Sequence, residues 1–236
     1  MGLVTSILLA AAAAQPSSAW VESCKKTEAA AASWNTYKAL ATLVDLEWKN
    51  DLEHCQKLET ALKKAQVIDL RNESVQDLTP VFALESVTQL LASNNQIKSI
   101  AGIERLKNLE LLDLGNNLIE DVSALPALKK LNQLRLAKNE VKDIKPLLGM
   151  PQLEKLSLAY NKLRDIEGLG SLQKLNYLSL ASNRIESSEA LKSLKNLQVL
   201  NLSFNVVCSP KSFDGFASKD IKIIGRDNQN CKDRSS

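Results

Sequence analysis

The sequence is poor in the residues from which active sites are usually built. Its 236 residues include a single histidine, His54, and only 4% of them are aromatic. It contains neither the nucleophile motif G-x-S-x-G, nor the zinc motif H-E-x-x-H, nor a glycine-rich phosphate loop. Because catalysis normally needs a cluster of titratable groups, we expect a protein that is not an enzyme and that holds neither a metal ion nor a cofactor.

An excess of charge of one sign is also missing. Lysine and arginine number 30, aspartate and glutamate 27, and the net charge is +3. A nucleic-acid-binding domain usually shows a clustered basic surface, so we expect no nucleic-acid partner. The apolar run at the N-terminus is too short to cross a bilayer, so we expect no membrane span.

Cysteines are few, and none of them forms a C-x-x-C pair, which argues against a zinc knuckle or a thioredoxin-like motif. Cys24 and Cys55 precede the central region of the chain, and Cys208 and Cys231 follow it. Three disulfide pairings are possible. We prefer Cys24–Cys55 and Cys208–Cys231, of which the second closes a loop of about 24 residues near one end of the protein.

The central region, residues 65–207, is a repeat with a strict period of 22 residues. Seven copies follow the pattern L-x-x-L-x-L-x-x-N-x-L, and no residue is inserted or lost between them. Such self-similarity is typical of a solenoid. The clearest copy has Leu109, Leu112, Leu114, Asn117 and Ile119 at the pattern positions.

Each copy predicts two structural halves. In the first half, apolar residues alternate with polar ones, which is the period of a half-buried strand. In the second half, apolar residues recur every three positions, as in Val122, Leu125 and Leu128, which suits a 3₁₀ turn. Successive strands then pair in parallel. The expected fold is an α/β solenoid with the sheet on its concave side and short helical turns on its convex side.

Two polar columns accompany the leucines. An unpaired amide among them would cost about 1–3 kcal/mol, but an asparagine side chain can both donate to and accept from the backbone of the turn that leaves the strand. We therefore expect a structural ladder made of Asn95, Asn117, Asn139, Asn161, Asn183 and Asn205. The second column, which we expect to supply helix N-cap acceptors, consists of Asp77, Asp121, Asp143 and Asp165.

The pattern resembles the 22-residue class of leucine-rich repeats, which includes the bacterial internalins and the leucine-rich-repeat regulatory subunit of protein phosphatase 1. The resemblance covers residues 65–216. Departures are Glu73, where asparagine is expected, and Ser188, where isoleucine or valine is expected. The resemblance implies a horseshoe-shaped protein that binds other proteins through its concave sheet.

A solenoid exposes an apolar cross-section at each end, so the repeats need caps. Residues 20–64 contain neither glycine nor proline and are rich in helix formers. We expect one long helix or a helical hairpin here, bent near residues 33–36 or 49–51; an amphipathic helix for a partner or a membrane is the alternative. Residues 208–236 form a smaller C-terminal cap, in which residues 220–224 predict one last strand, shifted by one residue from the repeat register.

Residues 1–19 have the pattern of a signal peptide. Residues 3–14 are apolar or small and have about the length of a signal-peptide h-region. Residues 17–19 fit a small-x-small cleavage site, and residues 12–14 are a second candidate. Together with the paired-looking cysteines, this predicts a secreted, periplasmic or cell-surface protein similar to the internalins. The alternative is an uncleaved, alanine-rich tail on an intracellular scaffold that resembles the phosphatase regulator.

The functional residues are expected on the concave sheet, between the leucines, where the core does not need large apolar side chains. Exposed aromatic residues are frequent binding anchors, and small neighbours such as Ala159, Ala181 and Ser203 would let a partner approach closely. We expect a monomer that binds a protein partner here; scattered surface apolar residues, which are normal, are the alternative. The expected surface comprises Tyr160, Tyr177, Val199 and Phe204, flanked by Arg135, Lys138 and Lys155.

Overall fold

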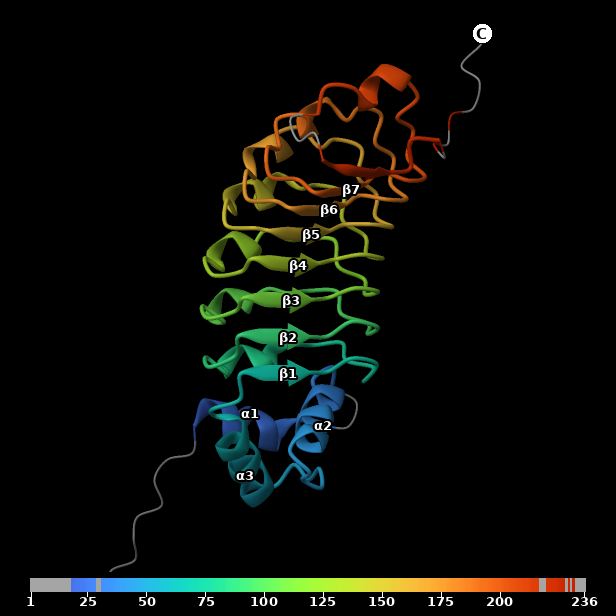
Figure 1. Ribbon diagram of the computed structural model, residues 1–236. Coiled ribbons are helices and arrows are strands. Elements are labelled where there is room, and N and C mark those ends of the chain that lie inside the picture. Colours follow the sequence, from blue (N-terminus) through green and yellow to red (C-terminus); the bar gives the residue numbers. More distant parts are fainter. Residues whose placement is uncertain (1–17, 29–30, 217–219, 228, 230, 232–236) are drawn as a thin grey trace, which may run out of the picture.

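The computed structural model of the chain describes residues 18–28, 31–216, 220–227, 229 and 231. Figure 1 shows one stack of short strands, with helices gathered at the N-terminal end. All eight strands belong to one parallel sheet, in which each strand pairs with the next one along the chain. The fold is therefore the expected leucine-rich-repeat solenoid. Most of the expected signal peptide, residues 1–17, lies outside the described residues.

Each strand is three residues long. In the first seven strands the middle residue is buried, while the first residue lies on the sheet surface. Neighbouring strands pair with an offset of 22 residues, as in Leu112 with Leu134. The last pair differs, because Asn201 lies opposite Ile224, an offset of 23. The expected shift of the final strand is thus confirmed. The strands are β1 Val67–Asp69, β2 Gln89–Leu91, β3 Leu111–Asp113, β4 Gln133–Arg135, β5 Lys155–Ser157, β6 Tyr177–Ser179, β7 Val199–Asn201 and β8 Lys222–Ile224.

Short 3₁₀ helices form the other side of each coil, as the spacing of three predicted. In one of them Leu125 is fully buried, and Val122 and Leu128 on either side of it also belong to the core. A 3₁₀ helix has three residues per turn, so apolar residues three apart face the same side. The 3₁₀ helices are η1 Thr79–Ala83, η2 Ile103–Arg105, η3 Leu125–Ala127, η4 Lys145–Gly149, η5 Leu169–Ser171, η6 Glu189–Leu191 and η7 Pro210–Phe213.

The asparagine column is a continuous ladder of hydrogen bonds. The amide nitrogen of Asn139 donates to the carbonyl of Leu136 in its own repeat (3.1 Å) and to that of Leu114 in the preceding repeat (2.9 Å). Its oxygen accepts from the N–H of Ile119, also in the preceding repeat, at 2.9 Å. Asn117, Asn161, Asn183 and Asn205 make the equivalent bonds. The amides therefore join consecutive repeats, as expected.

The ladder ends differently at its two ends. At the first repeat, where Glu73 replaces asparagine, the oxygen of Asn95 accepts from the N–H groups of both Glu73 and Val75. At the last repeat, Gln229 takes the place of an asparagine. Its side chain accepts from the N–H of Val207 at 3.2 Å and donates to the carbonyl of Leu202 at 2.9 Å. A glutamine outside the repeat register thus completes the ladder.

The aspartate column acts slightly differently from what we expected. The oxygen of Asp121 accepts from the N–H of Ser123, two residues on, at 2.8 Å. The formal N-cap of the following 3₁₀ helix is Ala124, which makes no side-chain cap bond. The carboxylate of Asp121 therefore stabilises a turn just ahead of the helix, and Asp165 makes the same bond. Asp77 and Asp143 instead accept from the N–H of the first residue of their helix.

The N-terminal cap consists of three helices, α1 Ala19–Lys26, α2 Trp34–Leu43 and α3 Leu52–Leu62. The prediction of one long helix or a hairpin was wrong, although the two suggested bends coincide with the starts of α2 and α3. At the second of these starts, the side chain of Asp51 accepts from the N–H of His54 and caps α3.

The cap is fixed to the first repeat by hydrogen bonds from buried side chains. The indole nitrogen of Trp20 donates to the carbonyl of Pro80 at 2.7 Å, and the hydroxyl of Thr36 donates to that of Asp77 at 2.5 Å. Within the cap, the rings of Tyr37 and Trp48 stack with centroids 5.6 Å apart. Burial raises the pKa of Tyr37 above its usual value. These contacts cover the apolar end of the sheet.

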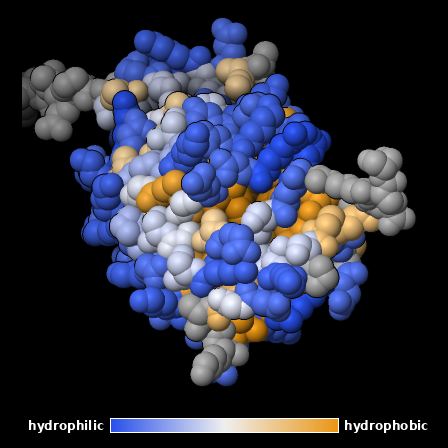
Figure 2. All heavy atoms as spheres, turned by 90° about the horizontal axis from the view of Figure 1, so that it is seen from above, coloured by the Kyte–Doolittle hydropathy of each residue, from blue (hydrophilic) through white to orange (hydrophobic). Residues whose placement is uncertain are grey.

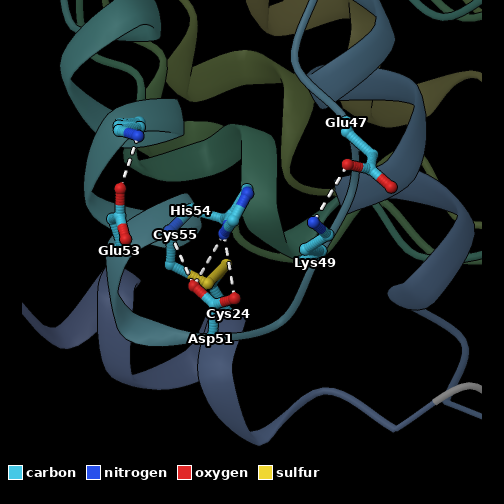
Figure 3. A network of polar contacts seen from close by, with 8 residues as sticks. Cys24, Glu47, Lys49, Asp51, Glu53, His54 and Cys55 are labelled. Atoms are coloured by element: carbon cyan, nitrogen blue, oxygen red, sulfur yellow. Dashed lines mark hydrogen bonds and ion pairs between the residues drawn. A yellow bond between two sulfur atoms is a disulfide. The ribbon is translucent and has the colours of Figure 1, made fainter.

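Each cap contains one disulfide. Cys24 on α1 is bonded to Cys55 on α3, and Cys208 is bonded to Cys231. These are the preferred pairs. Figure 3 shows the first bond beside the pair formed by Asp51 and the His54 ring, whose Nδ1 lies 2.8 Å from a carboxylate oxygen. Both sulfurs of the first bond are fully buried, so this disulfide is part of the packed interior of the helical cap.

The described residues of the C-terminal cap leave part of the apolar end of the solenoid exposed. Figure 2, viewed from this end, shows hydrophobic atoms in its middle, framed by hydrophilic ones. Phe216, Ile221 and Ile223 pack against the core but stay partly exposed. The close approach of β8 to β7 requires glycine at position 225, because its φ is +94° and a Cβ there would lie 2.3 Å from the Cα of Ser203.

Candidate protein-interaction surface

Three columns of side chains cross the exposed face of the sheet, and their residues recur every 22 positions. The entry column consists of the first residue of each strand. The middle column consists of the last residue of each strand. The exit column lies three residues further on, in the turn that leaves the strand. The exit column consists of Asn72, Asn94, Asn116, Lys138, Tyr160, Ser182 and Phe204.

Every residue of the exit column has a left-handed backbone, with φ between +53° and +65°. Asparagine tolerates this conformation, whereas a bulky side chain makes it an outlier that costs about 1–2 kcal/mol. The first three repeats have asparagine here, but later repeats have Tyr160 (54% exposed) and Phe204 (49% exposed). Neither ring is buried deeply enough for the core to explain its presence.

The entry column brings three of the predicted residues together. Tyr177 on β6 lies opposite Lys155 on β5 and opposite Val199 on β7. Neighbouring strands are about 4.8 Å apart, so these three side chains are direct neighbours. Tyr177 is 38% exposed. This row therefore offers an apolar surface with one cation at its N-terminal side.

The exit column holds a second group of the predicted residues. The ammonium of Lys138 lies over the ring of Tyr160, 5.8 Å from its centroid, which is a cation–π geometry. Phe204 lies two repeats beyond Tyr160, about 10 Å away at the usual strand spacing. Arg135 belongs to the middle column, where its guanidinium is 3.3 Å from a carboxylate oxygen of Asp113. The structure thus divides the predicted residues into two rows with an arginine at one end.

The small residues beside the aromatic ones contribute little exposed surface of their own. We expected them to let a partner approach closely. Ala159, Ala181 and Ser203 are buried, with exposed fractions of 5–8%. Their small size serves the tight turn between the strand and the exit column, where the N–H of Tyr160 donates to the carbonyl of Ala181. The exposed side chains in this part of the sheet face are therefore those of the two rows.

The N-terminal half of the same face has a different character. Asp69 in the middle column is held by Arg71, whose guanidinium Nε donates to it at 2.8 Å. This contact lowers the pKa of Asp69, against the opposing effect of burial. Asp113, also in the middle column, is paired with Arg135, so each of the two acids on this half has an arginine partner.

A hollow that the sequence did not suggest lies away from the sheet face, beside the turns of the fifth and sixth repeats. It is open, has a volume of about 600 Å³, and is lined mainly by charged residues, among them Arg164, Asp165 and Glu189. Within the residues that the structure describes, no three histidine, cysteine, aspartate or glutamate side chains are placed to hold a metal ion. Among the same residues, no helix is long and apolar enough to span a membrane.

Comparison with known families decides the class of the protein. The family described as "Leucine Rich repeats (2 copies)" matches residues 85–127, 129–171 and 173–217, which together make up more than half of the chain. The chain belongs to the leucine-rich-repeat family. Solenoids of this kind are protein-interaction modules that present an extended binding surface. No curated protein shows significant sequence similarity to the chain.

Solved leucine-rich-repeat structures share the fold. Internalin C2 from Listeria monocytogenes is 21% identical with a TM-score of 0.70, and the match covers 85% of this chain and 86% of that one. Internalin F from the same organism is 23% identical with a TM-score of 0.65, over 81% of this chain and 58% of that one. A leucine-rich-repeat protein from Leptospira interrogans is 28% identical with a TM-score of 0.65, over 71% and 44%. The chain thus spans most of internalin C2 but only about half of the other two.

Proposed function

We propose that the chain is an exported, non-enzymatic binding module that recognises a protein partner through the sheet face of its fourth to seventh repeats. The observation that carries the proposal is the pair of exposed aromatic rings at strained exit positions, Tyr160 and Phe204. Strain that the fold does not need is typical of functional sites. Tyr177 and Val199 extend the apolar area along the entry column.

Export is supported by the apolar N-terminal run and by the two disulfides, because disulfides persist in oxidising compartments. The contacts of the first described residues favour the second of the two cleavage sites. The hydroxyl oxygen of Ser18 accepts from the N–H of Val21 at 3.1 Å, which caps α1, and its O–H donates to Glu59 at 2.5 Å. Cleavage after Ala19 would remove this cap and place a positive amine at the helix N-terminus, which the helix dipole disfavours. Cleavage after Ala14 keeps both contacts.

N-terminal sequencing of the native protein tests export. A start at Gln15 supports export with an intact α1 cap, and a start at Trp20 supports export at the other site. An intact Met1 or Gly2 would instead support the alternative of an intracellular, phosphatase-regulator-like scaffold.

Affinity capture tests the binding surface. A variant with serine at Tyr160, Tyr177 and Phe204 should fold like the parent, because these side chains lie outside the core, and it should lose the captured partner. Serine at Val67 and Leu118, which are similarly exposed but lie outside the proposed surface, is the matched control. Equal capture by the triple variant and the parent would refute the proposed surface.

A further inference from the structure

We infer that the partner presents an acidic segment with apolar side chains between its carboxylates; this rests on the proposed function. The inference concerns the recognition window, which we define as the entry, middle and exit positions of the fourth to seventh repeats. The window consists of Gln133, Lys155, Tyr177, Val199, Arg135, Ser157, Ser179, Asn201, Lys138, Tyr160, Ser182 and Phe204.

The charge of the window has one sign. All twelve positions are described by the structure; three are cations and none is an acid. Arg135 is partly neutralised by Asp113, 3.3 Å away. With the described residues, Lys138 and Lys155 make no ion pair, and both are exposed. Two ammonium groups are therefore available to the carboxylates of a partner.

The nine equivalent positions of the first three repeats have a different balance. Asp69 and Asp113 are acids, and none of the nine is a cation. Both acids are paired with an arginine, Asp69 with Arg71 and Asp113 with Arg135. An acidic segment therefore finds ammonium groups that make no ion pair with the described residues in the window, and none at the equivalent positions of the first three repeats.

Lysine and tyrosine are arranged in the same way in both rows. In the exit column Lys138 is followed one repeat later by Tyr160, and in the entry column Lys155 is followed by Tyr177. In each pair the ammonium and the ring belong to neighbouring repeats, whose strands lie about 5 Å apart. One such pair accepts a carboxylate on the ammonium and an apolar group against the ring, and the tyrosine hydroxyl can donate to the same carboxylate. The window thus contains two equivalent subsites for an acidic residue beside an apolar one.

Selection from a random library of displayed 12-residue peptides on the immobilised protein tests this inference. The enriched peptides should be acidic and should contain aromatic or large aliphatic residues. Substitution of both Lys138 and Lys155 by glutamate should weaken binding of a selected peptide about tenfold or more, since close charge pairs across an interface are exchanged for repulsion. Rising ionic strength should weaken the binding of the parent as well.

Substitution of Lys129 and Lys195 by glutamate is the matched control. Both are exposed lysines outside the window, so the same peptides should bind this variant as they bind the parent. Heparin, a polyanion without apolar side chains, serves as a second probe. It should not compete with the selected peptides at physiological ionic strength, and competition would overturn the inference in favour of a polyanion site.

The outcomes separate the inference from the proposed function. Enrichment of neutral or basic peptides, or of no peptide, overturns the acidic segment. If partner capture is still lost in the triple serine variant, the sheet face remains the binding surface. If capture is unchanged in that variant, the proposed function and this inference fail together.

Discussion

The hydroxyl of Ser188, a fully buried side chain of the sixth repeat, donates a hydrogen bond to the backbone carbonyl of Ser212 in η7. The repeat pattern places isoleucine or valine at this position, and Ile166 occupies it one repeat earlier. The departure therefore has a structural reason. An aliphatic side chain would leave the carbonyl of Ser212 without this partner, so the serine joins the last coils to the C-terminal cap.

Restoring the repeat pattern at this position should destabilise the protein. Ser188→Val should lower the free energy of unfolding by about 1–3 kcal/mol, because the partly buried carbonyl of Ser212 loses this donor. Ile166→Val, at the equivalent position of the preceding repeat, should cost about 1 kcal/mol through the lost methylene alone. Urea unfolding followed by circular dichroism measures both. A Ser188→Val protein at least as stable as the parent would show that the bond to the cap contributes nothing.

Relief of the backbone strain at Tyr160 should raise the stability of the protein and at the same time weaken partner binding. Tyr160→Asn should raise the free energy of unfolding by about 0.5–1 kcal/mol, because asparagine tolerates the left-handed backbone and little buried area is lost. The same change should weaken partner capture. Asn94→Tyr, the reverse exchange in the same column, should lower stability without affecting capture. A Tyr160→Asn variant that is less stable than the parent would contradict the assignment of strain.

One rung of the asparagine ladder should be worth far more than a surface asparagine. Asn139→Ala leaves the N–H of Ile119 without its acceptor and removes one of the two ladder donors to each of the carbonyls of Leu114 and Leu136, so the free energy of unfolding should fall by about 1–3 kcal/mol. The control is Asn176→Ala, whose side chain makes no hydrogen bond with the described residues, and which should change stability by no more than about 0.5 kcal/mol. Hydrogen exchange should locate the loss in the third and fourth repeats. Equal effects of the two substitutions would rule out the ladder as a stabilising element.

Acid should weaken the turns that the aspartate column stabilises. Hydrogen bonds from the backbone N–H of Ser123, and then from its side chain, lower the pKa of Asp121. A carboxyl group whose pKa is lower in the folded state stabilises that state above its unfolded pKa of about 3.9 and loses this contribution as the pH falls through the folded value. The parent should therefore exceed Asp121→Asn in stability at pH 7, and the difference should shrink below about pH 4. Urea titrations from pH 7 to 3 measure this, and a constant difference would disprove the shift.

Much of the fold was predictable because every repeat places the same types of residue at the same positions. Leu112 and Leu134, for example, occupy equivalent positions in successive coils, so one copy predicts the strand, the turn and the ladder bond of the others. The breaks between the cap helices were less predictable, since neither glycine nor proline marks them. Asp51 could as easily lie inside a helix as cap one, and the choice depends on how α3 packs against α1.

The candidate surface was predictable in its residues but not in its conformation. The positions between the leucines identified Tyr160 and Phe204, yet their left-handed backbone has no signal beyond the asparagines at Asn72 and Asn94 in the same column. Gln229 was missed because it lies two residues outside the period. Its role depends on the shifted pairing of β8, and this shift alters which side chain reaches the end of the ladder.

The asparagine ladder also bears on how such a chain can change over generations. Each amide bonds only to its own turn and to the coil immediately before it, as Asn161 does with Val141 and Leu136. Any coil with the same pattern can precede any other. Duplication or deletion of one 22-residue block therefore conserves every ladder bond while moving Tyr177 and its neighbours along the sheet by one row. New combinations of surface residues can arise by recombination of whole blocks, while the bonding pattern of the ladder stays the same.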